Sequence, residues 1–361
     1  MTKGLTMTNG KQDDCAEISH PFYRLEESLE FPFHRFPPYA WNYEKEMKKE
    51  KLLADYFVNL KQWAAEPTLQ KHQAEWEKAL MCRSKYDFSL TTWNVATWRF
   101  LPSDLTSAQF ARFFIGSLPT TVLCFQEFPQ TMGSIPLGSI AFAFGDYKYQ
   151  TECIPKAHSM IPFGNRTYSQ WPFLYSEDVT MKPGKEGVEP RCFMPTVIPK
   201  PWKKENVPWV RVINTHLDVY DSTAAERKRE IVAILDYYHQ AQSKQSMPTI
   251  IVGDFNPTRK EHTYTSHVWS NLTQQKPTIL RDSITNGFWE QLDDANFVSA
   301  FEAIYGLNPG FTVWSGKTVD WIMLDGLARS EFSMIKSSAT IFPVPYSDHL
   351  PLACILKSIK H

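Results

Sequence analysis

Residues 250–256 read Ile-Ile-Val-Gly-Asp-Phe-Asn, an apolar run that ends in a carboxylate and an amide. A short apolar run of this kind, rich in β-branched residues, is typical of a buried strand. Alternate side chains of an extended strand share one face, so Asp254 and Asn256 would point the same way as Val252. The stretch therefore predicts a strand with an apolar face that becomes polar at its end.

The same ending recurs at other predicted strands. A lone His at a strand end is more often a structural residue than a functional one, and Asp-Phe-Asn can form an Asx turn. Burying many ionisable groups at separate places would, however, cost several kcal/mol each, which favours one shared polar site that holds a cation. The polar residues at strand ends are Asn94, Glu127, His216, Asp254, Asn256, Asp320, Asp348 and His349.

Composition and charge describe an ordinary globular chain. It has 361 residues, 43% of them hydrophobic, and a formal net charge of -1. This charge excludes a global basic field, so a nucleic-acid surface would have to be local. The cysteines are dispersed, without a CxxC pair or a zinc-spaced Cys/His cluster, and we expect reduced thiols in an intracellular protein.

The predicted secondary structure changes near residue 86. After this point short β-rich runs alternate with amphipathic helices, which predicts an α/β or α+β domain over 87–361 and an N-terminal extension over 1–86. Strands are expected at 88–95, 121–127, 171–175, 208–216, 248–254, 319–324 and 350–356, and helices at 104–116 and 222–242.

The extension has a polar, mobile start and then a helical pattern over 43–81, where Leu53, Phe57, Leu60 and Trp63 recur every three to four residues. This apolar face either packs on the main domain or binds a protein partner. The N-terminus lacks the apolar core of a secretory signal, and no run of about 18 apolar residues occurs. We therefore expect a cytoplasmic protein without a transmembrane segment, with the nucleus as an alternative location.

Six short motifs in order carry a family resemblance: TWNV (92–95), FQEF (125–128), NTHLD (214–218), GDFN (253–256), VDWIM (319–323) and SDHLPL (347–352). Together they resemble the endonuclease/exonuclease/phosphatase superfamily, which has the DNase I-like fold. The resemblance runs from about residue 87 to the C-terminus. It implies a four-layer α/β/β/α sandwich of two mixed β-sheets, with the site at one edge of the sandwich.

The resemblance also implies roles for the strand-end residues. Glu127 would be the principal metal ligand, Asn94 its neighbour through direct or water-mediated contact, and Asp348 a further ligand to the metal or its water. The implied catalytic set is Asp254 and Asn256 on the attacking water and the phosphate, His349 on the phosphate or nucleophile with Asp320 orienting it, and His216 on a non-bridging oxygen.

The chemistry of phosphate esters calls for the same residue types. Negative phosphate oxygens repel a nucleophile, so a hard cation held by carboxylate and amide oxygens must neutralise charge in the transition state. We expect Mg²⁺, with Mn²⁺ as a substitute, and not zinc. A His beside a carboxylate suits proton transfer or stabilisation of an oxyanion.

The substrate is left open by the motifs, since the superfamily includes enzymes for DNA, RNA tails, sphingomyelin and inositol phosphates. The segment 155–171 offers His158, Asn165 and Arg166 for phosphate or base, or is an ordinary loop; Arg99 is a phosphate-binding candidate or a surface cation. The first hypothesis is a phosphodiesterase or nuclease acting on nucleic acid. The alternatives are a phosphoesterase for a lipid headgroup or small soluble phosphate, and a non-catalytic binding protein on the same fold.

Overall fold

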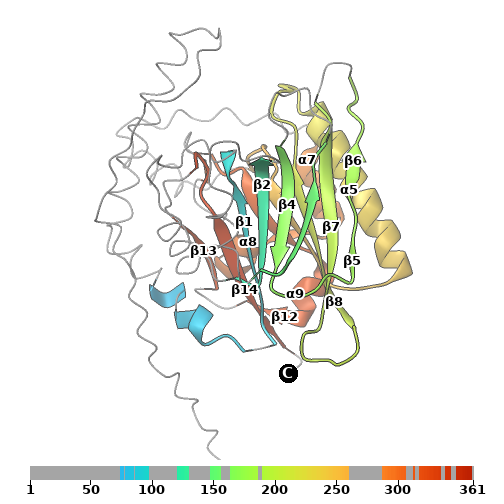
Figure 1. Ribbon diagram of the computed structural model, residues 1–361. Helices are drawn as coiled ribbons and strands as arrows, with labels where there is room; N and C mark the ends of the chain where they lie inside the picture. Colours follow the sequence, from blue (N-terminus) through green and yellow to red (C-terminus); the bar gives the residue numbers. More distant parts are fainter. Residues whose placement is uncertain are drawn as a thin grey trace, which may run out of the picture.

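Two mixed β-sheets of seven strands each lie face to face (Figure 1). The computed structural model describes residues 74–76, 78–84, 86–96, 120–129, 147–155, 163–185, 189–259, 287–305, 312–313, 317–334, 338–342 and 347–359. Strands β1 and β2 run parallel, as do β8 and β9, and the other pairs are antiparallel.

The first sheet has the order β12-β14-β1-β2-β4-β3, with β13 also paired to β14. Its strands are β1 (Phe88–Asn94), β2 (Val122–Pro129), β3 (Tyr149–Cys153), β4 (Phe163–Ser169), β12 (Phe332–Ser333), β13 (Ala339–Ile341) and β14 (Leu352–Ser358). Because β1 pairs with β14, the first and the last of the described strands are neighbours in one sheet.

The second sheet has the order β10-β11-β9-β8-β7-β5, with β6 also paired to β7. Its strands are β5 (Tyr175–Ser176), β6 (Val179–Met181), β7 (Arg191–Pro199), β8 (Pro208–His216), β9 (Thr249–Asp254), β10 (Val298–Ser299) and β11 (Asp320–Leu324). The described helices are α5 (Ala225–Lys244), α7 (Phe288–Asp294), α8 (Ala300–Tyr305) and α9 (Gly326–Glu331).

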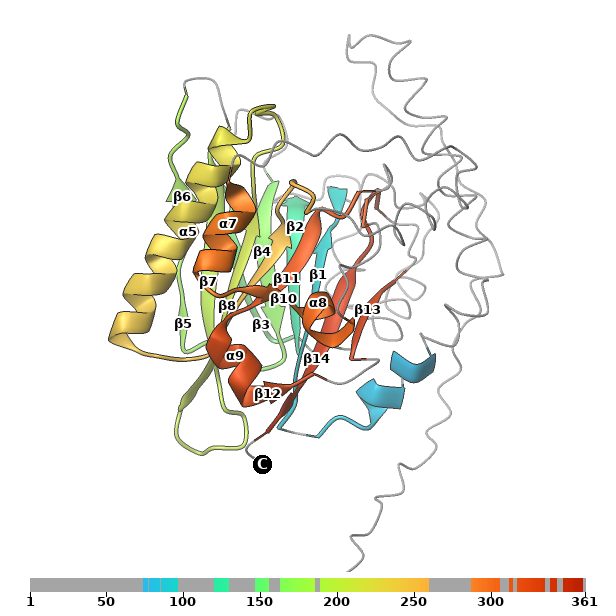
Figure 2. The same ribbon diagram turned by 180° about the vertical axis from the view of Figure 1, so that it is seen from behind.

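Alternation along the strands divides the apolar residues between two cores. Val212, Val252 and Ile322 face the first sheet and join the core between the sheets. Ile213 and Ile251 face the opposite way and pack against α5 and α7, which cover the outer face of the second sheet (Figure 2). The arrangement of two sheets and covering helices confirms the predicted α/β sandwich.

Most predicted elements are present, and the exceptions have physical reasons. The strand expected at 171–175 is wrong, because Pro172 lacks an amide donor and the chain turns there; only Tyr175 continues, into β5. Strand β7 went unpredicted because Pro195 interrupts its pattern. In the fold Pro195 lies between the residues that pair with β6 and those that pair with β5. The expected helix at 104–116 lies outside the described residues.

The part of the extension nearest to the sandwich packs against it. Trp76 is 1% exposed and meets Phe342 edge to face, with ring centroids 5.8 Å apart. The predicted apolar face of Leu53, Phe57, Leu60 and Trp63 lies outside the described residues, so its partner stays a prediction. Among the helices that the structure describes, none is long and apolar enough to cross a bilayer.

Two cysteines contradict the expectation of reduced thiols throughout. Cys153 in β3 and Cys192 in β7 form a disulfide although 39 positions separate them in sequence. Cys82, Cys124 and Cys354 are free among the described residues. The pairing depends on the two sheets facing each other, which no local pattern in the sequence reports.

Helix α5 holds the segment that follows β8 through a buried carboxyl. Glu230 is 1% exposed, and its Oε2 accepts a hydrogen bond of 2.8 Å from the backbone N–H of Asp218. Burial raises the pKa of Glu230 to about 7, against lowering by that hydrogen bond and by the charge of Arg191. The folded chain therefore keeps this proton in a pH range where the unfolded chain has lost it.

We expect the stability of the protein to fall between about pH 4.5 and 7 because of Glu230. The folded state favours the protonated form, so this contribution is complete below the unfolded pKa and is lost as pH rises through the folded pKa. Glu230→Gln cannot lose this proton. The unfolding free energy of the variant minus that of wild type should therefore be larger at pH 8 than at pH 4, by on the order of 3 kcal/mol. Urea unfolding at both pH values measures this difference. An equal difference between variant and wild type at both pH values would contradict the raised pKa of Glu230.

Candidate functional site

The polar strand ends meet at one edge of the sandwich. Strands β1, β2, β8 and β9 end there, and β11 begins there. Gly253 allows β8 and β9 to come this close: its φ is 141°, and a Cβ at this position would lie 1.8 Å from the carbonyl oxygen of Thr215. No side chain fits at this position, which gives the Gly of the GDFN motif its physical reason.

Asp254, the last residue of β9, lies at the centre of the cluster. Its Oδ2 accepts a 2.9 Å hydrogen bond from Asn94 Nδ2. The same oxygen lies 3.6 Å from His216 Nε2 and 3.7 Å from His349 Nε2. One carboxylate oxygen is thus surrounded by an amide and two imidazoles that come from different parts of the chain.

His349 is fixed on three sides. Its Nδ1 lies 2.9 Å from Oδ2 of Asp320. Its backbone N–H donates to Ser347 Oγ at 3.1 Å, and its carbonyl oxygen accepts from Trp93 Nε1 at 3.0 Å. Ser347 Oγ also donates to the carbonyl oxygen of Asn94 at 2.7 Å, which ties the His349 segment to β1. The imidazole is therefore held in one orientation before any substrate arrives.

The two imidazoles differ in charge: one is protonated and the other is neutral. Burial lowers the pKa of His349, but the negative charges of Asp320 and Asp254 outweigh it and raise this pKa to about 10. Burial and the positive charges of Arg191 and His349 hold the pKa of His216 well below its ordinary value. At neutral pH, His349 is an imidazolium and His216 is a neutral ring.

Burial also shifts Asp254. Loss of solvent raises the pKa of Asp254 to about 7, and the charges of Asp320 and Glu127 act in the same direction, whereas His349 and the Asn94 amide lower it. A carboxylate whose pKa lies near neutrality can take up a proton from water at physiological pH.

Glu127 is presented to the site by a distortion of β2. The β2–β4 register shifts between Phe125 and Phe128, and Glu127 has a φ of 50°. Such a bulge redirects a side chain. Asn94 Nδ2 donates to Glu127 Oε1 at 3.3 Å, and therefore holds this half-exposed carboxylate next to Asp254.

The donor set fits a hard divalent cation. Glu127 and Asp254 accept hydrogen bonds from one amide nitrogen, so two carboxylates lie together, and Asp320 Oδ1 is buried without a hydrogen-bond partner. Asp254 and Asp320 each offer a carboxylate oxygen within 4.8 Å of a ring nitrogen of His349, which as an imidazolium has no lone pair for a metal. Carboxylate oxygens in this number favour Mg²⁺ or Mn²⁺. Asp348 is buried with Oδ1 at 3.5 Å from Ser347 Oγ, and its role as a ligand stays a prediction.

Asn94 and Asn256 are each held by local hydrogen bonds. Asn94 turns its amide nitrogen to the carboxylates, while its Oδ1 accepts from Ala96 N–H at 3.0 Å, and its contact with a metal, direct or water-mediated, stays a prediction. Asn256 does not continue β9: its φ is 65°, its N–H donates to Asp254 Oδ1 at 3.0 Å, and its Nδ2 donates to Leu217 O at 2.8 Å. The chain makes an Asx turn at this point, so the shared strand face predicted for Asp254 and Asn256 is wrong.

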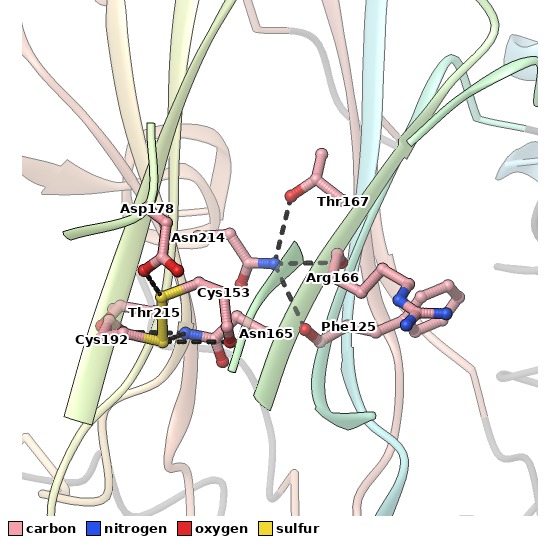
Figure 3. The surroundings of a disulfide bond; sticks show 9 residues. All are labelled: Phe125, Cys153, Asn165, Arg166, Thr167, Asp178, Cys192, Asn214 and Thr215. Atoms are coloured by element: carbon pink, nitrogen blue, oxygen red, sulfur yellow. Dashed lines mark hydrogen bonds between the residues drawn. A yellow bond between two sulfur atoms is a disulfide. The ribbon is translucent and has the colours of Figure 1, made fainter. Parts of the chain in front are cut away.

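Two of the predicted substrate-binding residues, Asn165 and Arg166, lie in the described part of the chain, and their side chains bond outside this cluster. Arg166 stacks over the Phe128 ring at 4.4 Å and pairs with Glu152, on the face of β4 opposite to its neighbour Asn165 (Figure 3). Asn165 is 2% exposed and donates to the carbonyl oxygen of Cys192, a burial that argues against contact with substrate. His158 and Arg99 lie outside the described residues.

Sequence reasoning missed a polar network beneath the site. Gln126 Nε2 donates to Asn214 Oδ1 at 2.7 Å across the two sheets, and Asn214 Nδ2 donates to the carbonyl oxygen of Phe125 at 3.2 Å. Ser347 and Thr312, whose Oγ1 accepts the N–H of Asp320, were also missed. The strand alternation that selected His216 also selects Asn214, so this residue carried a readable signal.

Comparisons with solved structures agree with this architecture. An endonuclease/exonuclease/phosphatase from Beutenbergia cavernae matches with a TM-score of 0.57 and 15% identity over 76% of this chain and 72% of that chain. A family protein from Bacteroides thetaiotaomicron matches with a TM-score of 0.51 and 13% identity over 75% and 97%. No protein-family model matches the chain, and no curated protein matches its sequence. The likeness is one of architecture: this chain has the sandwich fold of the endonuclease/exonuclease/phosphatase proteins.

Proposed function

We propose that the chain is a divalent-metal-dependent hydrolase of phosphate esters and that its substrate is a phosphodiester of nucleic acid. The observation that carries the proposal is the position of Asp254 Oδ2, between the Asn94 amide, a neutral His216 and a charged His349. A purely structural role would not require one buried oxygen to have one charged and one neutral imidazole as neighbours.

Each residue of the cluster has a role that follows from its state. Asp254 accepts the proton of the attacking water, since its pKa lies near neutrality. The His349 imidazolium, oriented by Asp320, donates to a phosphate oxygen and stabilises the negative charge that develops there. His216 donates to a second phosphate oxygen, and Asn256, tied to Leu217, orients the water.

Glu127 and Asp348 would hold the metal ion, with Asn94 keeping Glu127 in place. Mg²⁺ bound there would supply charge neutralisation at the phosphate oxygens. Mn²⁺, with the same preference for oxygen ligands, would substitute for it.

An exposed aromatic residue shortly after β8 supports a nucleic-acid substrate. Tyr220 follows His216 by four residues and is 73% exposed. Desolvation and the negative charges of Glu189 and Glu127 raise the pKa of its phenol, against lowering by the charge of Arg191. An exposed ring at this place is suited to stack on a base.

A second candidate is a phosphoesterase for a lipid headgroup or a small soluble phosphate. Val219 is 50% exposed beside Tyr220, so this part of the rim is apolar. An apolar rim would contact acyl chains as readily as bases.

Exchange of Glu127 tests the metal site. We expect Glu127→Gln to lower kcat at least about 100-fold with an unchanged melting temperature, because the carboxamide loses the charge that binds the cation. EDTA should remove wild-type activity and Mg²⁺ should restore it. Glu290→Gln, on the exposed surface of α7, is the matched control. Wild-type turnover of Glu127→Gln at limiting Mg²⁺ would refute the assignment.

The charge of His349 can be tested by a pH profile. Asp320→Asn removes the negative charge that raises the pKa of His349, so we expect the alkaline limb of kcat/KM to move to lower pH by at least about one unit. The profile should be measured with saturating Mg²⁺. Asp236→Asn, an exposed position of α5, should leave the limb in place. An unmoved limb in Asp320→Asn would mean that His349 does not set it.

The substrate class can be decided with labelled single-stranded oligonucleotides and sphingomyelin vesicles. We expect hydrolysis of the oligonucleotide, and a KM that Tyr220→Ala raises roughly fivefold or more through loss of base stacking. Tyr175→Ala, at another exposed tyrosine, serves as the control. Phosphocholine release from sphingomyelin without oligonucleotide cleavage would favour the second candidate instead.

A further inference from the structure

A disulfide joins the two sheets at the active-site edge. Cys153 ends β3 of the first sheet, and Cys192 is the second residue of β7 in the second sheet; their Cα atoms are 6.3 Å apart (Figure 3). Residue exposure is 0% for Cys153 and 2% for Cys192. The bond therefore connects an edge strand of one sheet to the sheet that carries His216 and Asp254.

The surroundings of both sulfur atoms also suit the reduced form. In the dithiol, Cys153 Sγ can donate a hydrogen bond to Asp178 Oδ1. Cys192 Sγ can donate to the carbonyl oxygen of Cys153, which lies 3.1 Å away. Disulfide sulfurs have no proton to donate, so these two acceptors have S–H partners only in the dithiol. Neither state leaves a buried thiol proton unsatisfied.

One side chain favours Cys192 as the reacting sulfur. The Nδ2 of Asn165 lies 3.6 Å from Cys192 Sγ, and this donor stabilises negative charge on the sulfur. Asp178, in contrast, opposes a thiolate on Cys153 by its own charge. Cys192 is therefore the better leaving group when the disulfide is attacked, and the better nucleophile when it re-forms.

A route from solvent to the pair runs through the outer strands. Asp178 is exposed and lies between β5, of two residues, and β6, of three residues. Short edge strands of this kind open at low free-energy cost. Opening there would expose Cys153 through its neighbour Asp178.

The disulfide is also coupled to the candidate site through backbone groups. The carbonyl oxygen of Cys192 accepts from Asn165 Nδ2 at 2.8 Å and from Thr215 Oγ1 at 3.3 Å. Thr215 directly precedes His216, and Asn165 pairs with Cys153 in the β3–β4 register. A change in the distance between the two sheets at this point would move the strand that carries His216.

We propose that Cys153 and Cys192 form a reversible redox clasp that holds β3 against β7 and thereby keeps His216 in its working position. A low-molecular-weight disulfide such as oxidised glutathione closes the clasp: the two thiols lose two protons and two electrons, one S–S bond forms, and two molecules of glutathione are released. Reduced glutathione reverses the exchange. The effect on turnover rests on the proposed function; the formation of the clasp does not.

The test uses the full chain in glutathione buffers of graded redox potential, quenched with N-ethylmaleimide. Intact mass and peptide mapping count the free thiols, and the melting temperature and kcat/KM are measured on the same samples. We expect the oxidised protein to bind two fewer maleimides, at Cys153 and Cys192, and to melt at least about 5 °C higher than the reduced protein. We also expect kcat/KM to be at least about threefold lower in the reduced form, since a displaced strand misplaces His216.

Cys153→Ser and Cys192→Ser should each abolish the dependence of the melting temperature and of kcat/KM on redox potential. Cys82→Ser, outside the pair, should keep both. The proposal is overturned if the two thiols react alike in all buffers, or if Cys153→Ser retains the shift in melting temperature. A thiol and melting response with unchanged kcat/KM would overturn the coupling to His216. A chain that hydrolyses no phosphate ester yet shows the thiol and melting-temperature responses would refute the proposed function and leave the clasp standing.

Discussion

The burial of the Asp254 carboxylate is the constraint on which the site depends. A carboxylate that is 2% exposed cannot keep its charge without compensation, and the fold supplies an amide and two imidazoles around a single oxygen. This arrangement needs β1, β8 and β9 to end at the same edge and the His349 segment to fold back over β1 through Ser347. The sheet packing and the polar cluster therefore require each other.

The same constraint explains why the two imidazoles differ in charge. Asp320 gives His349 a partner for its proton, whereas His216 has Arg191 and His349 as positive neighbours and, within the described part of the chain, only Asp254 as an ion-pair partner. In the proposed hydrolysis, the neutral His216 and the charged His349 would offer donors of different strength to the phosphate oxygens on which negative charge develops. The preorganisation comes from the side chains of Trp93, Ser347 and Thr312, which form hydrogen bonds to backbone groups of His349 and Asp320.

Much of the fold and cluster was within reach of the sequence, and the gaps have identifiable causes. Polar residues at strand ends predicted the meeting of Asn94, Asp254, His216 and His349, because strand alternation fixes their direction. The bulge at Glu127 escaped prediction, and the Asx turn at Asn256 was only an alternative to an extended strand, since both depend on left-handed backbone that the period of a strand does not report. The burial of Asn165 and the Cys153–Cys192 pair depend on how the sheets face each other, which is a long-range property.

The pairing of β1 with β14 has a consequence for synthesis of the chain. The first strand of the sandwich finds a neighbour in the last one, and His349 stands just before that last strand. Translation must therefore pass residue 358 before β14 can pair with β1 and close the first sheet. A nascent chain that has not yet reached residue 349 lacks the imidazole that the proposed hydrolysis needs.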